Sequence, residues 1–531
     1  MRPVVYVDID ATEGLNTGYS WTDAFTDLSE AINYAVWGQE IWIAAGTYLP
    51  SLCPNLETCT DRERHFTVRR GIPIYGGFDG AETARAERDW ETNQTILSGD
   101  FNGDDSWNAG TRTWENISEN ATHVFYHDWT IAPHLDETAI LDGVIITGGN
   151  ADSTEWMHQQ GGGMINWYNN SPVIVNTVFY GNSATASGGG MLNQENSSPT
   201  VTDCTFERNV SLFGAGMNNS DNSDPVVTGT LFTDNGMLLS ADGSGGGMAN
   251  NNNQPVITDC VFEGNIASSG GAMNNSASTL IIDSCSFIAN QGTGGGAIAN
   301  KSASQALIQN SLFYDNTAQD AGAINHREGD LVIISCEFLD NTSSRMAGAL
   351  VNNTATATIV NSLFLNNTTA QFGGAILSIY SDPIITNCTI SGNHAGGYGG
   401  GIGNGEADTV LRNSIVWGNT AGAAGPNIFN APEGNAFGPY FAASNPTYAY
   451  NDIQGCGGSG AWVGALGTDG GNNIDTDPLF IGSGDDPFDL QATSPCVDTG
   501  SNALVPAEIT TDILGDARIQ NTTVDMGAYE Q

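Results

Sequence analysis

The chain has 531 residues, 67 of them glycine, with only 14% charged residues and a formal net charge of −45. Binding to nucleic acid or to an anionic membrane surface needs basic patches, and one lysine with thirteen arginines argues against both. No apolar run approaches the roughly 18 residues of a membrane helix, so no membrane insertion is expected. The acidity most simply serves solubility, although it also suits the binding of divalent cations.

Residues 1–48 are expected to form an N-terminal cap. The runs 4–8 and 40–48 are rich in β-branched and aromatic residues and predict two strands. Between them, Asp27 and Glu30 mark a capping-box-like start of a short amphipathic helix. A helix placed here would cover the open end of a stack of strands, which otherwise exposes a core and an unpaired edge. Because Met1 leads directly into the first strand, we expect no signal peptide in this chain.

Residues 49–160 predict irregular coils with long loops, and one loop carries a candidate metal site. Asp100, Asn102 and Asp104 place side-chain oxygens at alternate positions, and Gly103 allows a sharp turn. This spacing is typical of the start of a calcium-binding loop. The distant bidentate glutamate that completes an EF-hand is missing, so bound Ca²⁺ competes with an ordinary Asx-rich turn as the interpretation.

Residues 161–424 contain one unit repeated ten times, and this repeat determines the fold. Each copy opens with three small residues and an apolar one, and closes with an apolar residue three positions before an asparagine. Successive copies are 25 to 27 residues apart, except for one of 31. They begin at Gly161, Gly188, Gly214, Gly245, Gly270, Gly295, Ala321, Ala347, Gly373 and Gly399. A fixed period of this length is the signature of a solenoid.

Three positions in each copy carry inward-facing apolar residues. One is the phenylalanine position of Phe262 and Phe313, the second lies five residues earlier, and the third follows the small residues. An Asn or Asp between the phenylalanine position and the apolar position five residues earlier predicts a turn. No copy has room for a helix. The pattern therefore predicts an all-β fold, a single-stranded parallel β-helix with about ten regular coils and irregular terminal coils. The asparagines from Asn182 to Asn419 are expected to hydrogen-bond from coil to coil.

Residues 425–531 lose the period and predict irregular C-terminal coils and a cap. Cys456 and Cys496 can pair across this segment, or one of them can join a cysteine of the coils. Cys53 and Cys59 flank a short loop and predict a local disulfide, which needs an oxidising compartment, against the alternative of two exposed thiols. The other five cysteines occupy inward positions and are expected to be buried, unreactive thiols: Cys204, Cys260, Cys285, Cys336 and Cys388.

The repeat signatures resemble those of a known group of proteins. Gly270-Gly271-Ala272-Met273, with the apolar-to-asparagine spacing of Phe338 and Asn341, is similar to the repeats of chlamydial polymorphic membrane proteins. It also resembles related bacterial right-handed β-helix proteins of the pectin-lyase-like superfamily. The resemblance covers nearly the whole chain and implies a right-handed β-helix that is exported and displayed at the cell surface, commonly as an adhesin. Because a fold does not fix an activity, the function stays open.

One arrangement of residues is a candidate for catalysis. A polysaccharide lyase needs a base that removes the proton next to a uronate carboxylate, and a cation that neutralises this carboxylate. Lys301 and Arg327 lie six residues after the starts of adjacent copies, so they are expected to stack about 5 Å apart on an outer face. His326 is beside Arg327, at a position where several other copies have Asn. Lys301 and Arg327 resemble the lysine and arginine of β-helix alginate lyases. The competing interpretation is a coincidence of surface charges. A hydrolase would need converging carboxylates, for which Asp315 and Asp340 are candidates, although both also suit a turn.

Trp167 and Tyr168 lie outside the inward positions, and their flat rings are candidates for stacking on sugars. The favoured interpretation is an extracellular or cell-surface scaffold or adhesin that faces glycans or matrix and is not catalytic. No cofactor is required, and Ca²⁺ is the one candidate. The alternatives are a polysaccharide lyase or glycoside hydrolase acting on acidic polysaccharide, and a structural filament or surface-layer subunit. These classes differ in whether a polysaccharide is turned over, merely bound, or not recognised at all.

Overall fold

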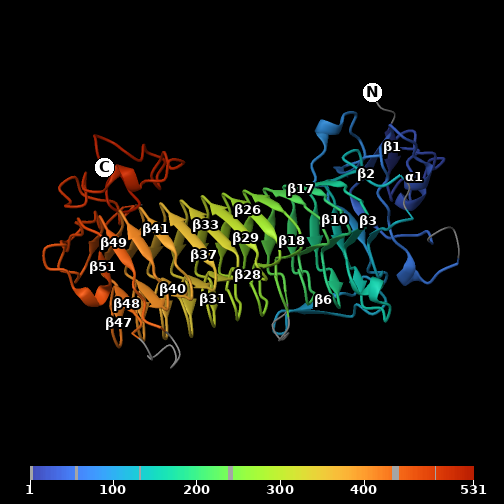
Figure 1. Ribbon diagram of the computed structural model, residues 1–531. Coiled ribbons are helices and arrows are strands. Elements are labelled where there is room, and N and C mark those ends of the chain that lie inside the picture. Colours follow the sequence, from blue (N-terminus) through green and yellow to red (C-terminus); the bar gives the residue numbers. More distant parts are fainter. Residues whose placement is uncertain (1–3, 54–57, 131–132, 237–242, 433–441, 485) are drawn as a thin grey trace. The chain divides into compact units, whose positions relative to one another are not determined.

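The computed structural model describes residues 4–53, 58–130, 133–236, 243–432, 442–484 and 486–531. The chain divides into two compact units, residues 1–274 and residues 275–531. In each unit, successive segments of the chain lie side by side as parallel strands (Figure 1). Among the described residues, no helix is long and apolar enough to span a membrane. The predicted all-β parallel solenoid is confirmed.

The strands of the first unit form three parallel sheets, which we call A, B and C, and neighbours in a sheet come from successive coils. Sheet A contains, in order, β1 (Val4–Val7), β2 (Glu40–Ala44), β4 (Ile74–Phe78), β9 (Ile140–Asp142), β13 (Val173–Val175), β17 (Thr200–Thr202), β20 (Val226–Thr228) and β23 (Val256–Thr258). Sheet B contains β3 (Gly46–Tyr48), β5 (Thr95–Ser98), β10 (Ile145–Thr147), β14 (Val178–Tyr180), β18 (Thr205–Glu207), β21 (Leu231–Thr233) and β24 (Val261–Glu263). Sheet C contains β8 (Phe125–His127), β12 (Met164–Trp167), β16 (Met191–Gln194), β19 (Met217–Ser220) and β22 (Met248–Asn251), and a short pair joins β11 (Asn150–Ala151) to β15 (Ser183–Ala184).

The second unit repeats the same three sheets, and the boundary between the units falls within β25 (Met273–Ser276). Its part of sheet A contains β26 (Thr279–Asp283), β29 (Gln305–Gln309), β33 (Asp330–Ile334), β37 (Thr356–Val360), β41 (Ile384–Thr386), β45 (Val410–Arg412), β49 (Thr447–Ala449) and β51 (Thr468–Asp469). Its part of sheet B contains β27 (Ser286–Ile288), β30 (Leu312–Tyr314), β34 (Glu337–Leu339), β38 (Leu363–Leu365), β42 (Thr389–Ser391), β46 (Ile415–Trp417) and β50 (Asp452–Ile453). Its part of sheet C contains β28 (Ile298–Lys301), β32 (Ile324–Arg327), β36 (Leu350–Asn353), β40 (Ile376–Ile379), β44 (Ile402–Gly405) and β48 (Ile428–Asn430). A fourth, narrow sheet contains β31 (Thr317–Ala318), β35 (Thr342–Ser343), β39 (Thr368–Thr369), β43 (His394–Ala395) and β47 (Thr420–Ala421).

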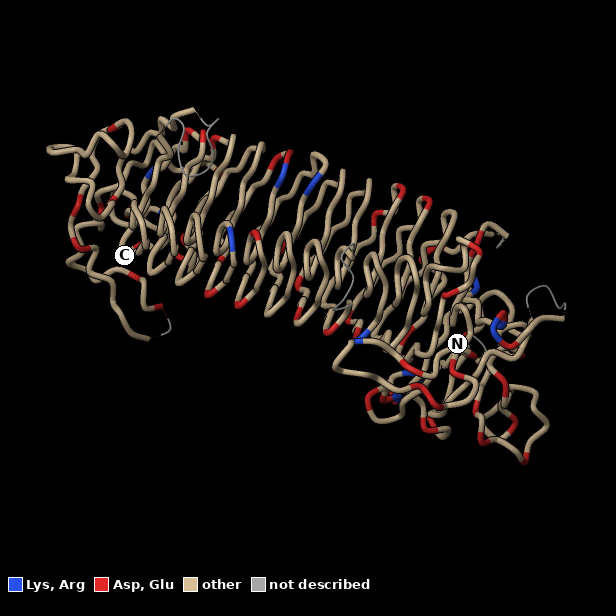
Figure 2. The backbone as a smooth tube through the Cα atoms, turned by 90° about the horizontal axis from the view of Figure 1, so that it is seen from below, with Lys and Arg blue, Asp and Glu red and all other residues tan. Residues whose placement is uncertain are grey.

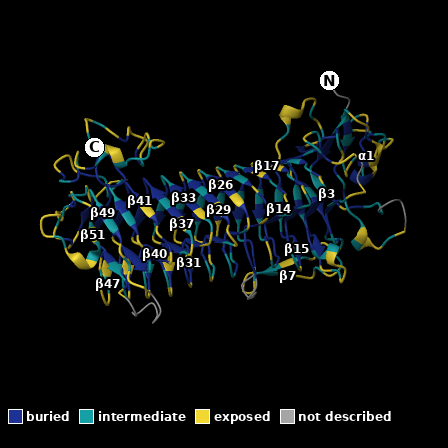
Figure 3. Cartoon of the chain, viewed as in Figure 1, coloured by how far each residue is buried: buried dark blue, intermediate teal, exposed yellow. Residues whose placement is uncertain are grey.

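Like residues recur at equivalent positions of successive copies, and we call each such row a ladder. These ladders explain why equivalent strands pair in register. In the first unit Phe179, Phe206 and Phe232 stack with ring centroids 4.5 and 4.8 Å apart, and their planes are nearly parallel. In the second unit Phe313 and Phe338 stack at 4.7 Å. Side chains one coil apart differ in position by about the interstrand spacing, so identical rings lie directly over one another. Buried residues line the inside of the coils in each unit (Figure 3).

The predicted asparagine ladder is present within each unit. Asn209 donates through Nδ2 to Asn235 Oδ1 at 3.0 Å and to the Phe179 carbonyl at 2.8 Å. Asn341 makes the same pair of bonds, to Asn367 Oδ1 at 3.0 Å and to the Phe313 carbonyl at 2.8 Å. Each amide therefore links neighbouring coils through side chain and backbone alike. The bonds satisfy polar groups that the bend of the coil would otherwise leave buried and unpaired.

The predicted capping helix is α1 (Leu28–Tyr34), which packs against β1 and β2. The Asp27 carboxylate accepts hydrogen bonds from the backbone amides of Ser29 and Glu30, at 2.7 and 3.2 Å. This is the N-cap arrangement that satisfies the first free amides of a helix. Short 3₁₀ turns occur at η2 (Asp61–Glu63), η3 (Arg85–Glu87) and η4 (Trp156–Gln159) in this unit, and at η5 (Gly464–Leu466) and η6 (Asn502–Leu504) in the other.

A hairpin of the first unit lies along the coils rather than within them. It consists of the antiparallel strands β6 (Ser106–Asn108) and β7 (Thr113–Glu115). The indole nitrogen of Trp114 donates to the Arg208 carbonyl at 3.0 Å, and Arg112 pairs with Asp234 at 3.3 Å. Arg208 and Asp234 follow β18 and β21, so the hairpin crosses the turns after successive strands of sheet B.

Candidate functional site

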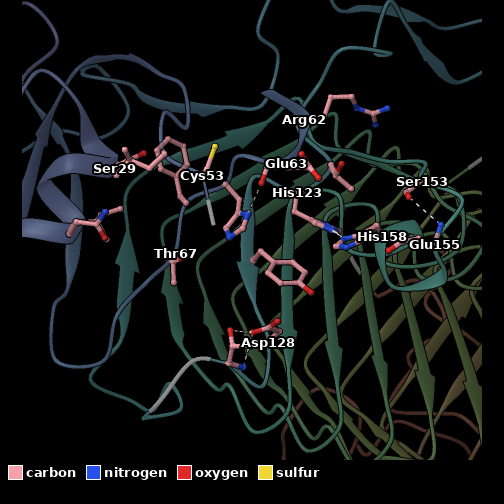
Figure 4. Close-up of a pocket in the computed structure, with 18 residues that line it drawn as sticks. Ser29, Cys53, Arg62, Glu63, Thr67, His123, Asp128, Ser153, Glu155 and His158 are labelled. Carbon is pink, nitrogen blue, oxygen red and sulfur yellow. Dashed lines mark hydrogen bonds between the residues drawn. The ribbon is translucent and has the colours of Figure 1, made fainter. Parts of the chain in front are cut away.

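A cavity of about 930 Å³ lies in the first unit, between the N-terminal cap and the start of sheet C (Figure 4). Its walls come from α1, from residues 52–53 and 62–67, from β8 with its flanks 122–130, and from residues 153–158. These segments belong to the irregular part of the chain, where the loops between strands are longest. In the described residues of the regular coils, the interior is filled by stacked side chains of equivalent positions.

Two histidines in this cavity form a hydrogen-bonded pair. His123 Nδ1 lies 2.9 Å from the Gly161 carbonyl, and His123 Nε2 lies 2.9 Å from His158 Nδ1. Burial lowers the pKa of His123 to about 3, so this ring is neutral and carries its proton on Nδ1, the nitrogen that faces a carbonyl. His123 Nε2 must then accept from His158 Nδ1.

Tyr126 on β8 lies among three imidazoles. Its ring centroid is 5.2 Å from that of His65, 5.0 Å from that of His123 and 5.8 Å from that of His158. Burial raises the pKa of Tyr126, and the charge and hydrogen bond of Asp128 raise it further, so the phenol stays protonated. Burial lowers the pKa of His65. The cavity thus presents neutral rings that can both donate and accept hydrogen bonds.

An aromatic cluster, which we define as Trp129, Trp156, Trp167 and Tyr168, adjoins the cavity. Trp129 lies between the cavity residues Asp128 and Thr130 in the sequence, and Trp156 follows the cavity residue Glu155. Trp167 is 7% exposed and packs against the other three rings, at 5.6, 6.2 and 5.0 Å. Trp129 and Trp156 are 52% and 56% exposed. Trp167 therefore fixes two large indoles that remain open to solvent.

The charges of the cavity are mainly acidic. Glu63, Asp128 and Glu155 line it together with one arginine, Arg62. Arg62 pairs with Asp152 at 2.5 Å and donates to two backbone carbonyls, so its guanidinium is already engaged. A carboxylate ligand would find no unengaged arginine or lysine among the described residues of this wall. The arrangement suits a neutral ligand rich in hydroxyl groups.

The structure brings the predicted aromatic pair together in the cluster beside the cavity, whereas the residues that line the cavity itself are ones that the sequence did not indicate. Trp167 and Tyr168 are stacked at 5.0 Å. Trp167 is largely buried, so the surface for a ligand comes from its neighbours rather than from Trp167 itself. The His65, His123 and His158 group was missed. A signal did exist, because five of the seven histidines fall within the irregular segment 49–160.

The three candidate lyase residues lie on paired strands of the second unit. Asn300 on β28 is opposite His326 on β32, so Lys301 and Arg327 hold equivalent positions on adjacent coils. His326, the candidate next to Arg327 in the sequence, is fully buried, so it does not share an outer face with Arg327, because successive residues of a strand face opposite ways. Arg327 pairs with Asp320 at 3.3 Å. Burial lowers the pKa of Lys301. Figure 2 shows how few lysines and arginines the coils carry.

The hydrolase candidates have the geometry of turn residues. Asp315 and Asp340 follow the paired strands β30 and β34, and both are exposed with φ of 54°. Asp and Asn tolerate this left-handed conformation better than most residues. The left-handed backbone conformation at these two positions therefore explains why aspartate occurs there.

Two residues of the metal site expected at Asp100, Asn102 and Asp104 lie close to further carboxylates. Asp100 and Asp104 lie with Asp105 and Glu119 in one group of carboxylates. Asn102 is exposed, and its backbone amide donates to Asp100 Oδ1 at 3.1 Å. Burial, and then the charges of Asp100, Glu119 and Asp104, raise the pKa of Asp105 to about 6, against a hydrogen bond from Asn120 that lowers it.

The cysteines divide as expected except at the C-terminal end. Cys53 and Cys59 form a disulfide. The five cysteines of the coils are buried and form no disulfide among the described residues, and burial raises the pKa of Cys204 to about 12. The expected pairing of Cys456 with Cys496 was wrong, because both are free. Cys496 donates to Asp452 Oδ2 at 3.2 Å and Cys456 to the Ile474 carbonyl at 3.3 Å, so each thiol has its own acceptor.

The fold and this cavity describe a parallel β-helix protein with an aromatic-lined site near its N-terminal cap. Residues 136–287 and 327–486 match the family model described as the right handed beta helix region. These segments make up more than half of the chain, so the protein belongs to the right-handed β-helix family. A search of curated proteins found no match.

Several solved structures are similar in fold. Pectate lyase Pel9A is 13% identical, the match covers 99% of this chain and 96% of that one, and the TM-score is 0.30. Tailspike protein 3 of bacteriophage CBA120 is 12% identical, with 96% and 65% covered and a TM-score of 0.34. XylC in complex with xylose is 10% identical, with 99% of both chains covered and a TM-score of 0.30. At these values the likeness carries no argument about activity.

Proposed function

We propose that this protein is an extracellular or surface-displayed β-helix that binds carbohydrate in its N-terminal cavity, as a scaffold or adhesin rather than as an enzyme. The observation that carries the proposal is the exposed pair Trp129 and Trp156, which pack on Trp167 and are next in sequence to residues that line a cavity of about 930 Å³. Indole rings bury the apolar faces of sugar rings, and hydrogen-bonding groups beside them receive the hydroxyls.

Two features indicate the kind of carbohydrate. The cavity presents neutral His65, His123 and Tyr126 and several carboxylates, while Arg62 is engaged by Asp152. A neutral glycan therefore fits better than the acidic polysaccharide considered from sequence, since a uronate would meet repulsion. The disulfide Cys53–Cys59 supports an oxidising compartment, and the chlamydial-type repeat signature agrees with surface display.

The test is binding to an array of neutral and acidic glycans, followed by calorimetry with the best ligand. We expect Trp129→Ala and Trp156→Ala each to weaken binding by about tenfold, because losing one stacked ring removes about 1.4 kcal/mol. Tyr314→Ala is the matched control, since Tyr314 is an exposed aromatic of the second unit, 42% exposed. Equal affinity in all three variants, or binding to uronates alone, would contradict the proposal.

A second candidate, a polysaccharide lyase, is favoured by one observation. Burial lowers the pKa of Lys301, which favours the neutral amine that can accept a proton. Arg327 occupies the equivalent position on the next coil. The assay follows the absorbance of unsaturated chain ends on a panel of uronate polysaccharides. If the protein is a lyase, Lys301→Met, which keeps the aliphatic stem, and Arg327→Ala lose the activity. If no unsaturated ends form with the wild type, this candidate is rejected.

A further inference from the structure

Four carboxylates gather at the base of the β6–β7 hairpin. Asp100, Asp104 and Asp105 belong to the segment that enters the hairpin, and Glu119 belongs to the segment that leaves it. One oxygen of each carboxylate lies within 4.8 Å of one oxygen of every other. Two oxygens bound to the same Ca²⁺ are at most about 5 Å apart, because each Ca–O distance is about 2.3–2.6 Å. One ion could therefore contact all four side chains.

A neutral side chain gives an independent indication of a positive partner. Asn120 is 1% exposed, and its amide nitrogen donates to Asp105 Oδ2 at 2.9 Å, which holds the amide group against the carboxylates. The amide oxygen of Asn120 is buried and has no hydrogen-bond donor among the described residues. Buried acceptors nearly always face a hydrogen-bond donor, an ordered water or a cation, so this oxygen marks a place for such a partner.

Two carboxylate oxygens of the cluster share this condition. Asp105 Oδ1 and Glu119 Oε1 are also buried, and no donor in the described part of the chain reaches them. Arg62 contacts Asn120 only through the backbone carbonyl and pairs with Asp152, so it does not satisfy these oxygens. Three buried acceptors in one place are what surrounds a cation, because a single ion can satisfy several oxygens at once.

We propose that Asp100, Asp104, Asp105, Glu119 and the amide oxygen of Asn120 bind one Ca²⁺. The ligands are all oxygens, which hard cations select, and their number leaves room for water in a coordination shell of six to eight. The ion joins the entering and leaving segments of the hairpin. It therefore helps to hold the hairpin along the coils, where Arg112 pairs with Asp234 and donates to the Gly264 carbonyl at 3.3 Å.

The experiment uses the full chain, freed of metal with a chelator. Calorimetry with CaCl₂ is expected to show one site per chain, and Tb³⁺ is expected to luminesce on excitation of Trp107 and Trp114 in the hairpin. Asp105→Asn and Glu119→Gln should each weaken Ca²⁺ binding at least tenfold. Asp79→Asn is the control, because Asp79 is an exposed loop carboxylate of the same unit outside the cluster, and it should bind as the wild type does.

Trypsin gives a second measurement that does not depend on the heat of binding. Ca²⁺ should slow cleavage after Arg112 in the wild type and in Asp79→Asn, but not in Glu119→Gln. A wild type that binds neither Ca²⁺ nor Tb³⁺ overturns the proposal. So does Ca²⁺ binding that Asp105→Asn and Glu119→Gln leave unchanged, since the ion would then lie elsewhere. Loss of binding in a variant supports the proposal only if its circular dichroism matches that of the wild type.

Discussion

His326 interrupts a row of buried amides that runs through sheet C. In the first unit Asn166, Asn193, Asn219 and Asn250 are linked by amide-to-amide bonds of 2.9, 2.8 and 3.0 Å. In the second unit Asn300 faces His326 on the neighbouring strand, and Asn352 faces it from the other side. Neither ring nitrogen of His326 makes a well-formed hydrogen bond, and buried amide atoms of Asn300 and Asn352 are likewise unpaired among the described residues.

We expect His326→Asn to stabilise the second unit locally by about 1 kcal/mol, because one amide can satisfy atoms on both sides. Hydrogen exchange of the β28, β32 and β36 amides should then slow by about fivefold. His326→Leu is the matched control, since it removes the polar ring but cannot link its neighbours. An asparagine variant that exchanges as fast as the wild type, or a leucine variant that gains as much, would refute the role of the row.

At the scale of elements, the repeat made the coils predictable, because each inward-facing position recurs in ten copies of the unit. Phe179, Phe206 and their equivalents had to be stacked once strands paired in register, and the turn residues Asn176 and Asp203 do adopt left-handed φ of 45° and 51°. A repeated signal averages out local ambiguity. The candidate site lacked this advantage, because its walls come from segments that occur once and meet only in three dimensions.

The same reason explains which site residues were found. Trp167 was recognisable as an aromatic outside the inward positions of a regular copy, whereas Trp129 lies in an irregular loop with no equivalent for comparison. The outward position of Arg327 followed from strand alternation, and the inward position of His326 would have followed from it too. The proposed Ca²⁺ ligands Asp100 and Asp104 are local in sequence, but Glu119 joins them only through the hairpin.

The C-terminal segment shows the limit of local patterns. The tail of the second unit folds against the outer side of sheet B instead of continuing the coils: Ala528 and Tyr529 pack on Leu363 and Leu365, and the Ala528 amide donates to Thr389 Oγ1 at 3.1 Å. The sequence of an apolar run does not show whether the run enters a core or covers a sheet from outside. Cys496 is buried in this outer layer, away from the pairing that sequence spacing suggested.

At the scale of the whole molecule, the two units are expected to respond oppositely to pH. In the first unit burial lowers the pKa of His123 to about 3 and of His127 to about 4. An unfolded histidine binds its proton near pH 6.5, so between about pH 6.5 and 4 the unfolded state holds more protons than the native state. Each of these histidines therefore costs stability as the pH falls through that window. Asp105 opposes them, since its pKa is raised.

In the second unit the buried acids change the stability with pH in the opposite direction. Burial raises the pKa of Asp452 to about 7 and that of Glu530 to about 7, whereas an unfolded carboxyl releases its proton near pH 4. Between about pH 4 and 7 the native state holds the extra protons, so the stability that these groups contribute is lost as the pH rises. Acidification from pH 7 to 5 should therefore strengthen the region around β50 while it weakens the region around β8.

Hydrogen exchange at pH 7 and pH 5, corrected for intrinsic rates, measures both regions in one sample. Each group contributes up to about 1.4 kcal/mol per pH unit within its window, or about tenfold in protection. At pH 5, protection of β8 and β12 should fall and protection of β50 should rise. His127→Gln should remove part of the first change and Asp452→Asn part of the second, and neither variant should alter the response of the other unit. If both regions gain protection equally, relief of the net charge of −45 would be the dominant cause instead of these buried groups.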